Sequence, residues 1–310
     1  MNKKYSKINK GIRNGLFSAI TWGADTALVG IVITSISNIS FYKAIFLAPF
    51  ITAFLHDLFS VIWVTIYLFL RRELKNSITK LKLKNTKEII LGGLLGGPVG
   101  MTCYLLSINY IGPSYTACIT ALYPAFGALL AKVILKERLN KKVWIGILLS
   151  LIGIVFLSDF IRFKDMDILG YIFATVCLVA WGSEAVLCSL GTRGEGLDTD
   201  TALFVRQLTS AIVYGFLIIP IIGGLDLTIT SLLKPEVLII IFISLLGTSS
   251  YLFYYSSIKK IGPSKAMGIN ITYFLWAVII DAVILNSNIS VKVIISGCMI
   301  LLGSYLIAKD

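Results

Sequence analysis

The chain has 310 residues, of which 57% are hydrophobic and only 14% are charged, and its mean hydropathy is +0.88. Soluble domains usually carry about one quarter charged residues, so this composition excludes an ordinary soluble domain and indicates an all-α protein that spans a membrane. The net charge of +12 would suggest a nucleic-acid partner in a soluble protein, but the positions of the basic residues argue against one.

Ten apolar stretches follow one another along the chain, each near the ~17–25 residues that cross the hydrocarbon of a bilayer. They cover residues 12–34, 46–70, 88–109, 113–135, 142–159, 168–190, 201–222, 236–258, 263–285 and 291–308. No small-residue cleavage site follows a short apolar segment, so we expect the first stretch to be retained. The connecting loops are short and leave no room for a soluble catalytic domain.

Parts of the chain repeat each other at constant offsets. The motif Ile-Gly-Pro-Ser occurs at 111–114 and at 261–264, and Trp-Gly-Ala-Asp at 22–25 is answered by Trp-Gly-Ser-Glu at 181–184. A duplication in so apolar a chain is typical of a transporter with two halves, here 12–159 and 168–308, and a substrate site between them. Five spans per half are an odd number, so the second half enters the membrane from the opposite side and the repeat is inverted.

Basic residues gather in alternate loops. They precede the first span and follow the second, fourth and eighth spans: Lys3, Lys4, Lys7, Lys10, Arg13, Arg71, Arg72, Lys75, Lys80, Lys82, Lys84, Lys87, Lys136, Arg138, Lys141, Lys142, Lys259 and Lys260. By the positive-inside rule these loops and both termini are cytoplasmic. We therefore interpret the positive charge as anchorage near anionic lipid, with the bilayer rather than a nucleic acid as the partner.

The sequence lacks the patterns of metal, cofactor and hydrolase sites. The five cysteines (Cys103, Cys118, Cys177, Cys188 and Cys298) lie in apolar spans without a CxxC pair, so we expect neither disulfides nor zinc. A single histidine cannot build a metal cluster, and no nucleophile elbow is present. The glycine-rich run 92–100 lacks the Lys-Ser/Thr of a phosphate loop, and we interpret it as close helix packing with a kink at Pro98. We expect no enzyme activity and no cofactor.

Six ionisable side chains are predicted to lie at membrane depth: Asp25, His56, Asp57, Glu184, Arg206 and Asp281. Such residues are costly in a bilayer and usually face a cavity or mark an ion path. Between the neighbours His56 and Asp57 we favour Asp57 as a gating or proton-linked group. For Arg206 we place pairing with a carboxylate ahead of substrate contact, with extension to the cytoplasmic interface as the other possibility. Asp281 has an interfacial position as its simplest explanation.

Aromatic residues share helix faces with two of the carboxylates. Trp181 lies three residues before Glu184, Trp22 lies three residues before Asp25, and the ninth span carries a stripe of Asn270, Tyr273 and Trp276. Tyr104, Tyr123 and Tyr254 come from spans three, four and eight. Ring faces beside a carboxylate suit a permanent cation such as a trimethylammonium group. Taken singly, Trp22, Tyr273 and Trp276 are also compatible with an interfacial aromatic belt.

The repeated Trp-Gly and Gly-Pro-Ser motifs in two five-span halves resemble the drug/metabolite transporter (DMT) superfamily in its EamA-type branch. The blocks 180–187 (AWGSEAVL) and 205–210 (VRQLTS), together with His56-Asp57 and 268–276, are similar to LicB-type choline permeases. This resemblance implies a multi-pass protein of the bacterial inner membrane that imports choline. It also implies an aromatic cage of Trp22, Trp181 and Tyr273, with Trp276 as an open fourth member, and Glu184 as the acidic residue. Asp25 departs from the family pattern as an additional carboxylate.

The sequence therefore predicts import of choline or a related quaternary amine by alternating access. The substrate-binding set is Trp22, Trp181, Glu184, Tyr273, Trp276, Asn270, Tyr104 and Tyr254, and the gating or proton-coupling set is Asp57, His56, Asp25 and Arg206. Uniport, proton symport and exchange all remain open, and no oligomer is required. The rival functions are an exporter of amino acids, metabolites or drugs, and a membrane scaffold or intramembrane enzyme subunit that transports nothing.

Overall fold

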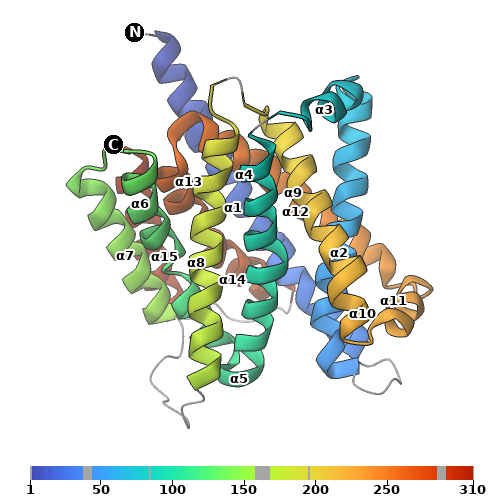
Figure 1. The fold of residues 1–310 in the computed structure, drawn as a ribbon. Helices are drawn as coiled ribbons and strands as arrows, with labels where there is room; N and C mark the ends of the chain where they lie inside the picture. The colour runs from blue at the N-terminus through green and yellow to red at the C-terminus, as the bar shows by residue number, and fades with distance from the viewer. Residues whose placement is uncertain are drawn as a thin grey trace.

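The structure is a computed structural model that describes residues 2–37, 44–83, 85–157, 168–194, 196–284 and 291–309. All regular structure in these residues is helical (Figure 1). The elements are α1 (Asn2–Ser37), α2 (Ala44–Leu70), α3 (Leu74–Lys80), α4 (Thr86–Leu94), the π-helical turn η1 (Leu95–Val99), α5 (Gly100–Thr120), α6 (Tyr123–Ile134), α7 (Lys141–Leu157), α8 (Ile168–Gly191), α9 (Thr199–Val213), the π-helical turn η2 (Tyr214–Ile218), α10 (Ile219–Ile221), α11 (Leu225–Leu232), α12 (Val237–Ile261), α13 (Pro263–Asn270), α14 (Tyr273–Ile284) and α15 (Val291–Ala308).

Seven helical segments of the described residues are long and apolar enough to cross a membrane: Phe46–Leu70, Thr86–Ile108, Ile168–Gly191, Thr199–Ile221, Val237–Ile261, Pro263–Ile284 and Val291–Ala308. Many large apolar side chains point away from the protein, among them Phe216 with 84% of its surface exposed. A surface of this kind suits contact with lipid chains rather than water. The count of ten spans stays a prediction.

The two halves of the chain pack on each other rather than each on itself. Helix α1 lies along α12 and α14, and α8 lies along α5 and α6; by the sequence repeat these two groupings are counterparts of one another. Helix α2 packs against α9, and α7 packs against α15 (Figure 1). The centre of the molecule is therefore built from helices of both halves.

Two predicted spans are broken near their middle. The fourth span is interrupted between α5 and α6 at residues 121–122, and the ninth between α13 and α14 at residues 271–272. Both breaks tighten the backbone in the same way. The backbone N–H groups of Leu122 and Thr272 each donate to the carbonyl three residues earlier, instead of four as in an α-helix. The Thr272 hydroxyl also bonds the Ile269 carbonyl at 2.9 Å, which competes with regular helical bonding.

The Gly-Pro-Ser motifs mark the start of a new helix only in the second half. There Gly262, at φ 84°, separates α12 from α13, with Pro263 as the first residue of α13. A positive φ favours glycine because it has no Cβ. In the first half the backbone stays helical from Gly100 to Thr120. The sequence-based expectation that one helix ends near residue 109 and the next begins near residue 113 is therefore wrong. A proline inside a helix removes one hydrogen bond and strains the preceding turn, but its φ lies in the helical range, so the helix can continue through it.

The glycine-rich run of the third span packs closely on α8 and α9. A side chain at Gly93 would come within 3.0 Å of the Arg206 carbonyl oxygen, and one at Gly96 would occupy the position of the Glu184 carboxylate. Within η1 the Gly96 carbonyl accepts a hydrogen bond from the Trp181 indole at 3.2 Å. The π-helical turn around Pro98 thus brings backbone within reach of two predicted site residues.

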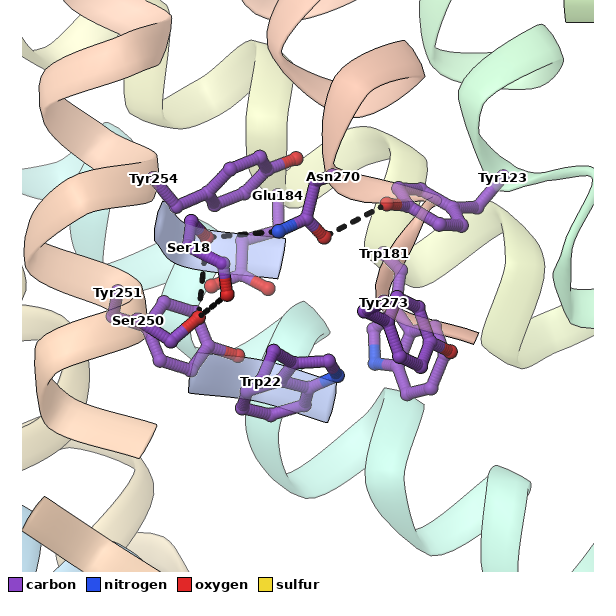
Figure 2. Close-up of a pocket in the computed structure, with 10 residues that line it drawn as sticks. All are labelled: Ser18, Trp22, Tyr123, Trp181, Glu184, Ser250, Tyr251, Tyr254, Asn270 and Tyr273. Carbon is purple, nitrogen blue, oxygen red and sulfur yellow. Dashed lines mark hydrogen bonds between the residues drawn. The ribbon is translucent and has the colours of Figure 1, made fainter. Parts of the chain in front are cut away.

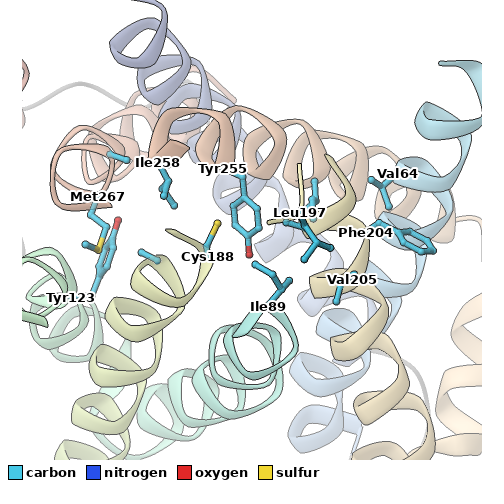
Figure 3. Close-up of a cluster of buried hydrophobic side chains, with 14 of the residues drawn as sticks. Val64, Ile89, Tyr123, Cys188, Leu197, Phe204, Val205, Tyr255, Ile258 and Met267 are labelled. Atoms are coloured by element: carbon cyan, nitrogen blue, oxygen red, sulfur yellow. The ribbon is translucent and has the colours of Figure 1, made fainter. Parts of the chain in front are cut away.

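A cluster of buried apolar side chains joins α8, α12 and α13 (Figure 3). Cys188, Tyr255, Ile258 and Met267 are all at most 1% exposed. Tyr123 also belongs to this cluster. Tyr123 also lines a cavity between the two halves, so the apolar cluster adjoins that cavity.

Helix α9, which carries Arg206, begins at a well-formed cap. The Asp198 carboxylate accepts hydrogen bonds from the Thr201 amide at 2.9 Å and from the Lys80 ammonium at 2.7 Å. Burial disfavours the ionised carboxylate, but these bonds outweigh burial and lower the pKa of Asp198. The cap fixes where α9 starts and so helps to set the depth of Arg206.

Candidate functional site

A cavity lies where helices of both halves meet (Figure 2). It is lined by Ser18, Trp22, Tyr123, Trp181, Glu184, Ser250, Tyr251, Tyr254, Asn270 and Tyr273. These residues come from α1, α6, α8, α12, α13 and α14. The cavity volume is about 60 Å³. A single water molecule needs about 10–15 Å³ of volume measured in the same way, so several waters or a small organic ligand would fit.

Aromatic rings form much of the cavity wall. Trp22 meets Tyr251 edge to face, with ring centroids 5.4 Å apart, and lies 6.4 Å from Tyr273 at nearly a right angle. Trp181 meets Tyr123 in the same manner at 6.2 Å. Edge-to-face contacts leave some ring faces free to turn toward the opening, and such faces attract cations.

One edge of the cavity is polar. The Asn270 amide donates to Ser18 Oγ at 2.8 Å and its carbonyl accepts from the Tyr123 hydroxyl at 3.2 Å. Ser18 and Ser250 hydroxyls are 3.1 Å apart, and Ser250 also donates to the Ser18 backbone carbonyl at 2.9 Å. These bonds, drawn in Figure 2, tie α1, α6, α12 and α13 together at the cavity.

The carboxylate at the cavity is ion-paired. Glu184 Oε1 accepts from Arg206 Nε at 2.9 Å and from the Tyr255 hydroxyl at 3.2 Å, and Arg206 lies over the Tyr251 ring at 4.4 Å. Arg206 is 3% exposed, so its extension to an interface is wrong and pairing with a carboxylate is what the structure shows. Among the described residues no side chain donates to Glu184 Oε2.

Arg206 connects this pair to a second acidic group. Arg206 Nη1 lies 3.6 Å from Asp57 Oδ2, which accepts a 2.5 Å hydrogen bond from Ser210. The other Asp57 oxygen is 3.4 Å from His56 Nδ1, and His56 Nε2 is 3.0 Å from Asp25 Oδ1. Five ionisable side chains, each at most 8% exposed, thus form one continuous chain from the cavity to α1.

The structure separates some residues that the sequence predicts to act together. The Asp25 carboxylate turns to His56 and does not line the cavity beside Trp22. Tyr104 lies behind the wall, with its ring 5.3 Å from Trp181. Trp276 packs at Gly23 of α1, outside the lining. Tyr273 and Trp276 belong to the same helix, α14, where residues three apart point about 60° away from each other, and of the two only Tyr273 lines the cavity.

Four lining residues lie outside the predicted substrate-binding set: Ser18, Tyr123, Ser250 and Tyr251. A sequence signal exists for the two serines, because Ser18 and Trp22 are one helical turn apart, as are Ser250 and Tyr254. Tyr123, noted in the sequence only as a repeat-related aromatic, also lines the cavity. In the described part of the chain no group of three or more His, Cys, Asp or Glu side chains could hold a metal ion. The side chains of Asp281 and Cys118 lie outside the described residues.

Comparison with known proteins identifies the family. The profile of the EamA-like transporter family matches residues 9–159 and again residues 168–309. The chain belongs to the EamA-like transporter family. It is therefore a multi-pass membrane transporter and not an enzyme.

Several individual proteins resemble this EamA-like transporter. It is 36% identical to Protein LicB of Haemophilus influenzae over 190 residues, which cover 61% of this chain and 63% of LicB. The match thus spans less than two thirds of LicB. It is 28% identical over 232 residues to the uncharacterized transporter YyaM of Bacillus subtilis, covering 71% of this chain and 72% of YyaM. A solved crystal structure with 16% sequence identity aligns over 96% of both chains with a TM-score of 0.70, which shows a shared fold.

Proposed function

We propose that this EamA-like transporter imports choline or a closely related quaternary amine across the bacterial inner membrane. The observation that carries the proposal is the cavity between the halves, where Trp22, Trp181 and Tyr273 stand around an opening that Glu184 also lines. A methylated ammonium donates no hydrogen bonds, so ring faces and a nearby carboxylate hold it better than polar side chains do. The similarity to LicB and the LicB-type sequence blocks support this substrate class.

The charge of the buried network favours a cation. Asp25, Asp57 and Glu184 carry three negative charges when ionised, whereas Arg206 and a protonated His56 carry two positive charges. The sum is negative even with His56 protonated. A cation in the cavity therefore meets a favourable long-range field in a medium that screens charge poorly.

The same network disfavours an amino acid as substrate. A zwitterion needs a cationic partner for its carboxylate, and Arg206 lies behind the cavity wall. Each of its three guanidinium nitrogens already donates a hydrogen bond: Nε to Glu184, Nη1 to Gln207 and Nη2 to Tyr251. A substrate carboxylate could reach Arg206 only past the cavity wall and in competition with Glu184 and Asp57, which disfavours export of amino acids, the main rival function.

Transport in this proposal follows alternating access between two inverted halves of five spans each, with both termini in the cytoplasm. The inside-negative potential favours cation entry by about 2.3 kcal/mol per charge per 100 mV, so a proton need not take part. If a proton does, we assign it to Asp25, His56 and Asp57, because two carboxylates bracket one imidazole there. The charge of Glu184 is already matched by Arg206.

The deciding experiment is flux in proteoliposomes that contain the purified protein. Under an imposed inside-negative potential we expect uptake of labelled choline and no uptake of labelled zwitterionic amino acids. The matched control is Trp276→Phe, a change outside the cavity lining that should leave choline uptake nearly unchanged. Uptake of amino acids without choline would replace the proposal with the amino-acid rival, and the absence of any flux from folded protein would favour a scaffold.

A further inference from the structure

We propose that Asn270 and Ser250 form a hydroxyl-binding subsite that makes the transporter select amino alcohols over quaternary amines without a hydroxyl. The inference rests on the proposed function, because it takes the cationic head to lie among the aromatic rings. It adds to that function by assigning the residues that contact the hydroxyl end of the ligand.

At the polar edge of the cavity, Ser18, Ser250 and Asn270 together retain one N–H donor and several unused acceptor lone pairs, one of them on Ser250. Ser250 has a single hydroxyl proton, which it donates to the Ser18 carbonyl, so the proton between the two serines must come from Ser18. Ser18 in turn accepts from one of the two Asn270 N–H groups. The second Asn270 N–H donates to none of the described side chains, and Ser250 Oγ keeps one lone pair.

A hydroxyl group matches this remaining capacity. It can accept a hydrogen bond from the Asn270 N–H and donate its own proton to Ser250 Oγ. A carboxylate could use the donor but not the acceptor, and an alkyl group could use neither. The subsite therefore favours an alcohol by chemistry and not by size alone.

The position of this edge suits a ligand with a cationic head and a short polar arm. In the view of Figure 2, Ser18 and Ser250 lie on one side of the opening, and Trp181 and Tyr273 lie on the other. Asn270 and Ser250 are 9% and 2% exposed, so an unpaired N–H there has little access to bulk water. A ligand that fills the cavity without a hydroxyl leaves that donor unsatisfied.

Binding of two cations of equal size tests the subsite. Choline and propyltrimethylammonium differ only in a hydroxyl against a methyl group. In detergent-purified wild-type protein we expect propyltrimethylammonium to bind about five- to twenty-fold more weakly than choline. Asn270→Leu, which keeps the approximate side-chain volume, should weaken choline binding and reduce this preference to about two-fold or less. Ser250→Ala is the milder second variant, should Asn270→Leu fail to fold, and should reduce the preference in the same direction.

Trp181→Phe is the matched control, because it weakens the ring contact with the head that both ligands share. It should lower both affinities and leave their ratio unchanged. If wild-type protein binds both cations with equal affinity, the hydroxyl subsite is wrong while the proposed function stands. A preference that survives unchanged in folded Asn270→Leu and Ser250→Ala also overturns the subsite. If neither cation binds, the proposed function itself fails, and this inference with it.

Discussion

At the scale of single residues, Arg206 determines how the cavity carboxylate acts. Arg206 and Glu184 are 3% and 5% exposed and bonded at 2.9 Å, so neither charge has water as an alternative partner. Glu184 therefore has two roles: it forms a structural ion pair with Arg206, and its negative charge attracts a cation in the cavity. Removing one member leaves the other charge buried and uncompensated, which is more costly than removing both.

The first prediction concerns this pair. Glu184→Gln should destabilise the folded protein by about 3–5 kcal/mol, and Arg206→Gln by a similar amount, whereas the double variant should lose clearly less than their sum. Thermal unfolding of the purified variants in one detergent measures the coupling. Additive losses would show that the two charges do not stabilise each other. Choline binding should be lost in Glu184→Gln, because the buried network with His56 protonated then has no net negative charge to attract the cation.

The second prediction concerns the rings. Trp181→Ala should weaken choline binding by about 1–2 kcal/mol, roughly five- to thirty-fold, and Trp181→Phe should retain part of the affinity. Trp276→Phe is the control, because that indole packs against α1 outside the cavity lining, and it should leave affinity nearly unchanged. Equilibrium binding of labelled choline gives all three constants. A larger effect at Trp276 than at Trp181 would relocate the cation site.

At the scale of helices, the third span brings backbone up to the site through glycine. The third prediction compares two positions in the same run. A methyl group at Gly96 would overlap the Glu184 carboxylate, whereas one at Gly92 would lie 3.4 Å from its nearest neighbour, the Leu187 Cβ. Gly96→Ala should abolish choline uptake, and Gly92→Ala should be tolerated, because alanine otherwise suits a helix better than glycine by about 1 kcal/mol. Equal uptake by both variants in proteoliposomes would contradict the close approach.

The helices also show what the sequence could predict and what it could not. Apolar length and the Trp-Gly blocks placed α1 and α8, together with Trp22, Trp181 and Glu184. Periodicity within one helix extends only as far as the helix does. No glycine or proline marks the break at 271–272, so the sequence does not predict it. Asn270 and Tyr273 nevertheless both line the cavity, whereas Trp276, three residues further along α14, does not. Which carboxylate pairs with Arg206 depends on contacts between distant helices, which spacing along the chain does not contain.

At the scale of the whole molecule, the helices of each half pack mainly on helices of the other half. This arrangement suits a transporter whose central cavity opens to one side of the membrane at a time. The fourth prediction concerns its energy source. A uniporter of a monovalent cation should accumulate choline about fifty-fold at an inside-negative potential of 100 mV. With an acidic exterior at the same potential, a one-proton symporter should gain up to about ten-fold more per pH unit.

Variants of the acidic chain separate these mechanisms. Under symport, Asp25→Asn should remove the gain produced by the pH gradient while the gain from the potential persists. A pH-driven gain that survives unchanged in Asp25→Asn and Asp57→Asn would exclude both carboxylates as proton carriers. Accumulation that never responds to the pH gradient in wild-type protein would establish uniport.

The pairing of buried charges across the two halves has a consequence for biosynthesis. Asp57 reaches the membrane early, but Ser210, which bonds it, follows 153 residues later, and Arg206 comes only shortly before Ser210. At about 5–20 residues per second the ribosome needs roughly 8–30 s to supply them. During that interval Asp25, His56 and Asp57 face lipid or the insertion machinery without their cation. A nascent chain arrested after its first half should therefore be a preferred substrate for membrane proteases, and co-expression of the missing half should protect it.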